Sequence, residues 1–206
     1  MDERVETRLS LIVGGAALRS FCLLTGRGFG VDVPAACTLR ELLCGRLGIE
    51  PDYIEARIQT IFLNSKAVDD PRTAVVAAGS TIGLSGPMPG IAGAILRKES
   101  RLSSMRSSIS HVAQDNDPPT ERSGDVTVRL FNVLQRELGP SLLEQGIRIA
   151  GEALADFFRR HANVLHSAVQ TAEMDGEPVV VSVLRSTDWT GRRVQLQVTA
   201  CPRAER

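Results

Sequence analysis

Short apolar stretches along the first hundred residues are separated by turns rich in glycine and acidic residues. Residues 9–13 and 18–24 form two such stretches, each followed by glycines that favour turns. Residues 29–33 alternate between apolar and polar positions, which predicts a strand. Residues 58–64 and 80–85 are rich in β-branched or aromatic side chains, which predicts two more strands. The segment therefore opens with a predicted hairpin and continues with two further strands.

One helix is predicted between these strands. Thr38 and Glu41 form a capping box, in which the threonine oxygen and the glutamate carboxylate each bind a backbone N–H of the first turn. Behind it leucines recur at helical spacing, at Leu39, Leu42, Leu43 and Leu47. Burial of this face predicts a two-layer α+β domain with the helix across a mixed sheet. Leu42 and Leu43 are expected to be buried where the helix crosses it.

The C-terminal part of the chain has a fainter version of the same pattern. Residues 126–131 predict a first strand, and residues 152–161 predict a helix with Leu154, Phe157 and Phe158 on one face. An Asp175-Gly176 pair predicts a hairpin turn. Residues 194–198 alternate strictly and predict the last strand.

The stretch between the two patterns has the composition of a linker. Residues 97–123 are rich in serine and charge and contain Pro118-Pro119. Leu102, Met105 and Ile109 recur there at helical spacing, which predicts a short helix docked on a neighbour. The sequence thus predicts a first domain at 1–96, a protease-sensitive linker at 97–123 and a second domain at 124–206.

Two strings in the first domain resemble a known family. FGVDVPAACTLRELL and IFLNSKAVDDPRTAVVAAGSTIGLSGPMPG are similar to the ubiquitin-like β-grasp superfamily, and more closely to its MoaD/ThiS sulfur-carrier branch. The resemblance covers residues 8–94, with Asn64-Ser65-Lys66 where the family commonly has Asn-Gly-Lys. VTVRLF and LQRELG resemble the start of the same carriers. The resemblance implies two tandem β-grasp domains, each a mixed sheet with one packed helix.

Charge and composition narrow the classes of partner. The 206 residues include 24 basic and 24 acidic side chains, so no net charge steers the chain onto nucleic acid or an anionic membrane. No run of ~18 apolar residues indicates a membrane span, and the acidic start is not typical of a signal peptide. A cytoplasmic location is expected.

No residue pattern predicts an enzyme. The four cysteines form no C-x-x-C pair, and the three histidines lie at no zinc-ligand spacing from them. We expect buried thiols, no metal, no cofactor and no catalytic residues. Cys201 is the one cysteine for which a reactive role stays open.

The remaining candidate residues have ordinary structural interpretations beside the functional ones. Asp69-Asp70 is interpreted as a solvated turn. A local basic stretch could contact an acidic partner, although a solvated linker explains it as well: Arg97, Lys98, Arg101 and Arg106. Trp189 either packs over the end of the second domain or forms an exposed contact.

The resemblance implies chemistry at a terminal Gly-Gly, because only glycines thread the narrow channel of an activating enzyme. Here the glycine-rich tail is internal, at Gly90 and Gly93, and the sequence ends CPRAER. Three functions follow. One is a modifier or adaptor of the kind found in bacterial antiphage conjugation systems, trimmed near Ala200 or Cys201. Its partners would be an E1-like activating enzyme, an E2-like protein and a JAB-type peptidase. The second is a sulfur carrier cleaved near Gly90 or Gly93, and the third is a self-associating structural protein.

Overall fold

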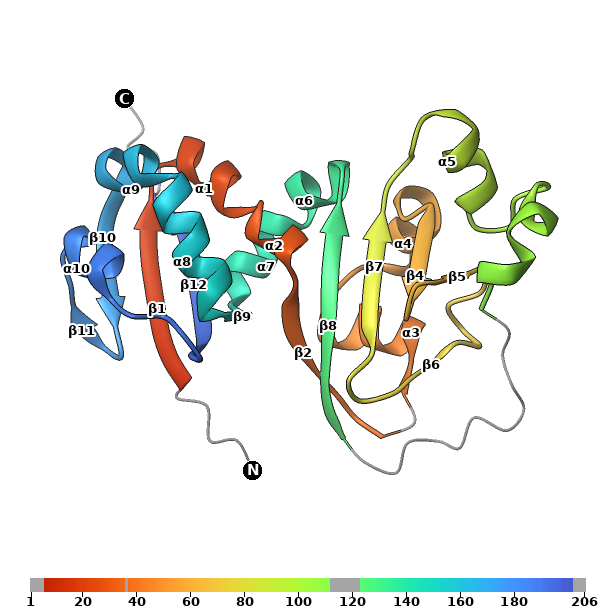
Figure 1. Cartoon of the computed structure of the whole chain (residues 1–206), viewed down its shortest axis with the longest axis horizontal. Helices are drawn as coiled ribbons and strands as arrows, with labels where there is room; N and C mark the ends of the chain where they lie inside the picture. The colour runs from red at the N-terminus through yellow and green to blue at the C-terminus, as the bar shows by residue number, and fades with distance from the viewer. Residues whose placement is uncertain (1–5, 36, 112–122, 202–206) are drawn as a thin grey trace. The chain divides into compact units, whose positions relative to one another are not determined.

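The computed structural model describes residues 6–35, 37–111 and 123–201, and in it the chain divides into two compact units. We call Gly30–Gln135 the continuous unit, and Met1–Phe29 together with Arg136–Arg206 the composite unit. Each unit combines helices with a mixed sheet, so the predicted α+β class is confirmed at that level (Figure 1). Within the described ranges, no helix has the length and apolar character needed to cross a membrane.

The sheet of the continuous unit has five strands in the order β2-β8-β7-β4-β5. They are β2 (Phe29–Val33), β4 (Thr60–Leu63), β5 (Lys66–Val68), β7 (Thr81–Ser85) and β8 (Gly124–Phe131). β7 and β8 are parallel, and β4 is antiparallel to both β7 and β5. β3 (Cys37–Thr38) and β6 (Val75–Val76) form a separate two-stranded ladder.

The predicted helix of the continuous unit begins at its capping box. The Glu41 N–H donates to Thr38 Oγ1 at 3.3 Å, and the Thr38 N–H donates to the Glu41 carboxylate at 2.8 Å. These bonds to Thr38 lower the pKa of Glu41. The helix starts as α3 (Leu39–Glu41) and widens into the π-helical η1 (Leu42–Arg46), where the Leu47 N–H reaches back to the Leu42 carbonyl. α4 (Pro51–Arg57) follows.

The leucine face of this helix is buried as predicted. Leu42 and Leu43 are both 0% exposed. Replacement of either by alanine should therefore cost ~2–5 kcal/mol of unfolding free energy, measured by chemical denaturation. Arg46→Ala, on an exposed position of the same turn, should cost less than ~0.5 kcal/mol. Equal, small losses at all three positions would show that the helix face is misassigned.

The composite unit contains five neighbouring strands, in the order β11-β10-β1-β12-β9. Its strands are β1 (Glu6–Val13), β9 (Ile147–Ala150), β10 (Val169–Met174), β11 (Glu177–Pro178) and β12 (Arg193–Ala200). β1 is parallel to β12, with Leu9 opposite Leu196, and antiparallel to β10. β9 is antiparallel to β12.

Within its described residues, the composite unit also contains six short helices. They are α1 (Gly15–Phe21), α2 (Leu24–Arg27), α7 (Gly139–Gln145), α8 (Gly151–Arg160), α9 (Ala162–Ala168) and α10 (Val181–Ser186). α6 (Val133–Glu137) crosses the boundary of the two units in sequence.

Trp189 belongs to the aromatic core of the composite unit. It is 2% exposed, and its indole N–H donates to the Leu184 carbonyl at 2.9 Å. Its ring meets Phe158 edge-on at 6.0 Å, and its carbonyl lies where a Cβ on Gly151 would be. The sequence left two interpretations of Trp189 open, packing over the end of the second domain or an exposed contact. The exposed contact is wrong, because the side chain is buried.

Each unit takes one strand from the far side of the 97–123 stretch. β8 follows that stretch in sequence, yet it pairs with β7, with Ile82 opposite Val128 and Leu84 opposite Leu130. β1 lies near the start of the chain, yet it pairs with β12 and β10. The continuous unit is thus inserted in sequence between the two parts of the composite unit, which differs from a division at 96 and 124.

Candidate functional site

The glycine-rich segment after β7 is folded: close packing requires glycine at two of its positions, and a positive φ favours glycine at a third. Gly90, at φ +79°, begins α5 (Gly90–Leu96). Gly93 is buried, and a Cβ there would lie 1.9 Å from the Met88 carbonyl oxygen. Gly86 is also buried, with Val133 2.5 Å from the position of a Cβ. The segment is therefore a short irregular stretch followed by a helix, and Gly90 and Gly93 belong to the helix rather than to an extended tail.

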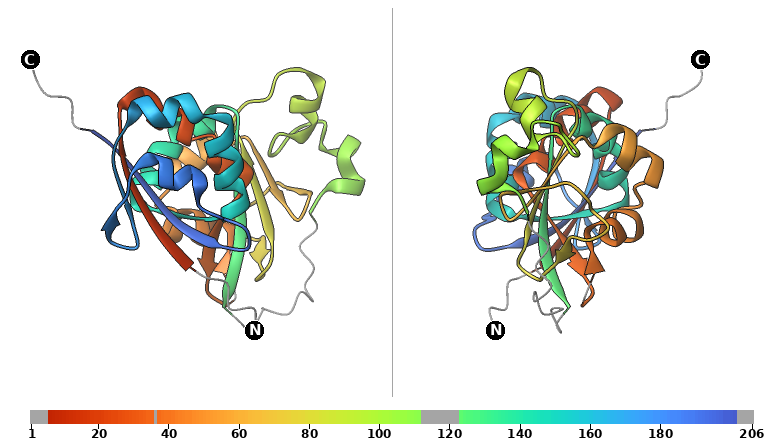
Figure 2. Two further views of the ribbon diagram at one scale, coloured as in Figure 1. Left: turned by 60° about the vertical axis from the view of Figure 1, so that its left-hand side comes forward. Right: turned by 90° about the vertical axis from the view of Figure 1, so that its right-hand side faces the viewer.

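The residues after α5 are bound to the outermost strand of the same sheet. We call Arg97–His111, which contains the 3₁₀ helix η2 (Ser103–Ile109), the strap. The Lys98 N–H donates to the Gln59 carbonyl at 2.7 Å, and the His111 N–H donates to the Ala67 carbonyl on β5 at 2.7 Å. Ser110 adds an isolated parallel bridge to Ala67. Figure 2 shows α5 and η2 beyond β5, so the strap covers a sheet edge that would otherwise offer unpaired backbone groups.

Arg106 anchors the strap from within. It is 2% exposed, and its guanidinium donates to the Ile95 carbonyl at 2.9 Å, Ser110 Oγ at 2.8 Å and the Asp69 carboxylate at 2.5 Å. The same carboxylate accepts the Glu99 N–H at 2.9 Å. One buried cation thereby joins α5, the end of the strap and the turn after β5. A planar guanidinium suits this role because its five donors can bind several acceptors at once.

Lys98 ties the strap to α4. Its ammonium donates to the Ile54 carbonyl at 3.0 Å and lies 3.8 Å from the Glu55 carboxylate. Burial lowers the pKa of Lys98, and the nearby Glu55 acts in the opposite direction. Arg97 Nε donates to Gln59 Oε1 at 3.1 Å.

These contacts change the interpretation of the basic stretch. Arg106 is removed from the contact candidates because its side chain is buried. The Lys98 side chain is only 10% exposed and is held in an ion pair. Arg97 and Arg101 remain exposed. The predicted short helix is present as η2, but its apolar face does not dock: Leu102 is 39%, Met105 66% and Ile109 43% exposed. Residues 112–122, the rest of the predicted linker, lie outside the described residues.

A charged hollow of about 320 Å³ lies beside these anchors. Its lining includes four acids and three cations: Glu55, Asp69, Asp70, Glu99, Arg72, Arg97 and Lys98. Asp70 pairs with Arg72 at 2.9 Å, and the hydrogen bond from Arg72 lowers the pKa of Asp70. The four acids and three cations leave one negative charge in excess, and the lining contains no histidine or cysteine nucleophile. Across the described ranges no three His, Cys, Asp or Glu side chains gather as metal ligands.

Ala200 and Cys201, the other predicted processing position, lie at the end of β12. Ala200 is opposite Val13, and the Cys201 N–H donates to the Val13 carbonyl at 2.8 Å. Cys201 is half-buried. Among the other thiols, burial raises the pKa of Cys22 to about 11 and also raises that of Cys37. The two predicted processing positions therefore differ: Gly90 and Gly93 lie in the helix α5, whereas Ala200 and Cys201 lie at the end of a strand.

Gly93→Ala should open the strap, because the new Cβ would collide with the backbone oxygen of Met88. We expect trypsin to cut after Arg97 and Arg101 at least about tenfold faster than in the unaltered chain, as local opening becomes less costly. Gly15→Ala is the matched control, since no atom lies within 4 Å of its added Cβ. Unchanged cleavage in Gly93→Ala would contradict the close packing.

We compared the chain with protein-family models, with curated proteins and with solved structures, and none of the three comparisons gives a match.

Proposed function

We propose that this protein is a non-catalytic, ubiquitin-like modifier or adaptor that acts by presenting folded surfaces to protein partners. The observation that carries the proposal is the closed glycine segment. Gly93 is packed on Met88, and the following strap is held by the buried Arg106. A sulfur carrier needs its glycine tail extended and accessible, so the closed segment argues against that alternative.

The β-grasp part of the proposal is supported by two hairpin turns. Asn64 and Ser65, between β4 and β5, have φ of 49° and 67°. This is the conformation that Asn-Gly favours, and Asn-Gly is what the MoaD/ThiS family commonly has at this position. In the composite unit, Asp175 and Gly176 have φ of 55° and 89° between β10 and β11. Similar turns in both sheets favour two related units.

Further support comes from the continuous unit, where a five-stranded mixed sheet is accompanied by the capped helix that starts at Leu39. In this proposal an E1-like activating enzyme, an E2-like protein or a JAB-type peptidase would act near Ala200 and Cys201. Binding without covalent attachment would need none of them. The third alternative, self-association, gains no specific support from the geometry.

The experiment is mass spectrometry of the protein isolated from the cells that naturally make it, with the recombinant chain as the reference. The proposal expects every native species to retain residues 86–111 uncut. Such species would be unmodified, trimmed just after Ala200 or Cys201, or joined to another protein near that point. A native species that ends at Gly90 or Gly93, with or without a thiocarboxylate, would overturn the proposal and select the sulfur carrier.

A further inference from the structure

A second hollow lies entirely within the composite unit, between α2 and α8. It measures about 290 Å³ and is lined by Leu23, Leu24, Arg27, Phe157, Arg160 and His161. Phe157 stacks on His161 with ring centroids 4.4 Å apart, which gives the hollow an aromatic wall. Leu23 is 48% exposed, so the hollow and its surroundings carry accessible apolar surface. None of the six lining residues is acidic.

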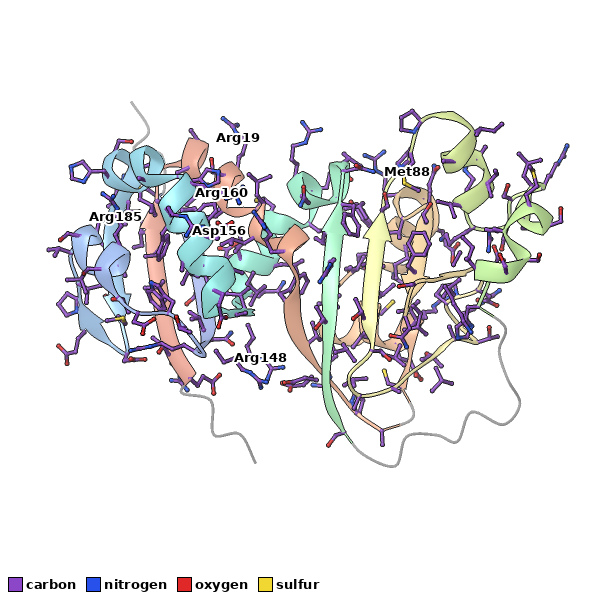
Figure 3. All side chains as sticks on the ribbon, viewed as in Figure 1. Arg19, Met88, Arg148, Asp156, Arg160 and Arg185 are labelled. Atoms are coloured by element: carbon purple, nitrogen blue, oxygen red, sulfur yellow. The ribbon has the colours of Figure 1, made fainter. Side chains whose placement is uncertain are left out.

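Three arginines converge on one carboxylate beside this hollow. Arg27 Nη2 lies 3.0 Å and Arg160 Nε 2.9 Å from Asp156 Oδ2, and Arg159 also pairs with Asp156. Figure 3 shows Asp156 and Arg160 together on α8. One negative charge against three positive charges leaves two positive charges in excess. The hydrogen bond from Arg160 lowers the pKa of Asp156, so the carboxylate stays ionised and holds the arginines in place.

The arginines keep donors for a ligand. A guanidinium has five N–H groups, and the contact with Asp156 uses only part of this set. The side chains of Arg27 and Arg160 are 53% and 61% exposed, so other donors face solvent near the hollow. Guanidinium groups bind carboxylates in a bidentate geometry, which makes a carboxylate the matching partner group.

We propose that the α2/α8 hollow binds an acidic peptide segment of a protein partner. One large apolar side chain would sit against Phe157 and Leu23, and flanking carboxylates would pair with Arg27 and Arg160. The volume lies just below the ~300–1,000 Å³ typical of small-molecule pockets, which favours a single anchoring side chain. The biological role of this binding rests on the adaptor proposal. The binding of the peptide to the hollow does not depend on that proposal.

The test uses the full chain and a fluorescein-labelled peptide, Gly-Glu-Glu-Leu-Glu-Glu-Gly, followed by fluorescence anisotropy at about 0.15 M salt. We expect binding below roughly 1 mM, with at least about tenfold weaker binding when the peptide's leucine is replaced by serine or its glutamates by lysines. Absence of binding below roughly 1 mM would overturn the proposal. Equal or tighter binding of a labelled uridine oligonucleotide would also overturn it, because the site would then recognise nucleic acid.

Variants of the protein test whether the peptide binds at the α2/α8 hollow. Leu23→Ser and Arg160→Gln change exposed side chains at the hollow, and circular dichroism should show that both variants fold. Each is expected to weaken peptide binding about tenfold. Arg185→Gln removes the same charge from α10, outside the lining of the hollow, and should leave binding within about twofold. Equal losses in Arg160→Gln and Arg185→Gln, or no loss in Leu23→Ser, would overturn the proposal. Mass spectrometry of the protein isolated from its own cells tests the adaptor proposal separately. A failure of peptide binding can therefore be told apart from a failure of the adaptor proposal.

Discussion

A chain cut once within residues 112–122 should remain a single particle. The strand β8, which follows the cut, pairs with β7 in the continuous unit, and β1, which precedes it, pairs with β12 and β10 in the composite unit. Each fragment therefore supplies a strand to a sheet built mainly from the other. The three core residues of β8, Val126, Val128 and Leu130, are at most 1% exposed. Burial of three such side chains contributes ~5–9 kcal/mol, which is comparable to the whole stability of a typical domain.

The measurement places a specific protease site in this segment and compares cut and uncut chains by size-exclusion chromatography. We expect both to elute together under native conditions, and two bands only on a denaturing gel. The fragment 1–111 made alone lacks β8 and should fail to unfold cooperatively. Two fragments that separate on the column and each unfold cooperatively would contradict the exchanged strands and support a sequential division of the chain.

Asp69→Ala should be strongly destabilising, because it leaves the buried guanidinium of Arg106 without its counter-ion. Loss of one partner of a fully buried ion pair typically costs ~3–5 kcal/mol, and solvent at the 43% exposed Asp69 side chain places the expected loss at or below the lower end of this range. Arg106→Met should cost less, since the Asp69 side chain is 43% exposed and stays hydrated. We expect this ranking in chemical denaturation of the full chain, together with faster tryptic cleavage after Arg101.

The neighbouring acid provides the control for this prediction. Asp70 pairs with Arg72, whose side chain is 64% exposed, and surface pairs of this kind contribute less than ~1 kcal/mol. Asp70→Ala should therefore be mild. If Asp69→Ala were as mild as Asp70→Ala, Arg106 would not be the anchor of the strap.

Elements with a specific local signal were predictable from the sequence, because such signals lie within a few residues. The capping box at Thr38 and the Asp175-Gly176 turn are both present. The opening hairpin was predicted wrongly: residues 18–24, expected as its second strand, lie in α1 (Gly15–Phe21), the turn after it and the start of α2 (Leu24–Arg27). Their apolar run has no period that separates a short strand from a short buried helix.

Strand partners were not predictable, because β1 and β8 have the same alternating apolar pattern and either could complete either sheet. Pairing between residues as distant as Leu9 and Leu196 is a tertiary property that no local pattern specifies.

The strap was not predictable for a related reason. Helical spacing of Leu102, Met105 and Ile109 correctly indicated a helix, but apolar periodicity assigned the wrong face to the interior. Arg106 points inward because Asp69, 37 positions earlier, lies opposite it in the fold. Charged side chains are rarely buried without such a partner, so neither residue alone predicts the pair.

Amide hydrogen exchange across residues 86–111 tests the closed glycine segment most directly. The N–H groups of Arg97, Lys98, Glu99 and His111 donate to Gly93, Gln59, Asp69 and Ala67 respectively. We predict that these four amides exchange at least ~100-fold more slowly than in an unstructured peptide, which corresponds to ~2.7 kcal/mol for local opening. Exchange of all four at the unstructured rate, while β4 stays protected, would contradict the account: the segment would then be open, and Gly90 and Gly93 would be accessible as a carrier tail requires.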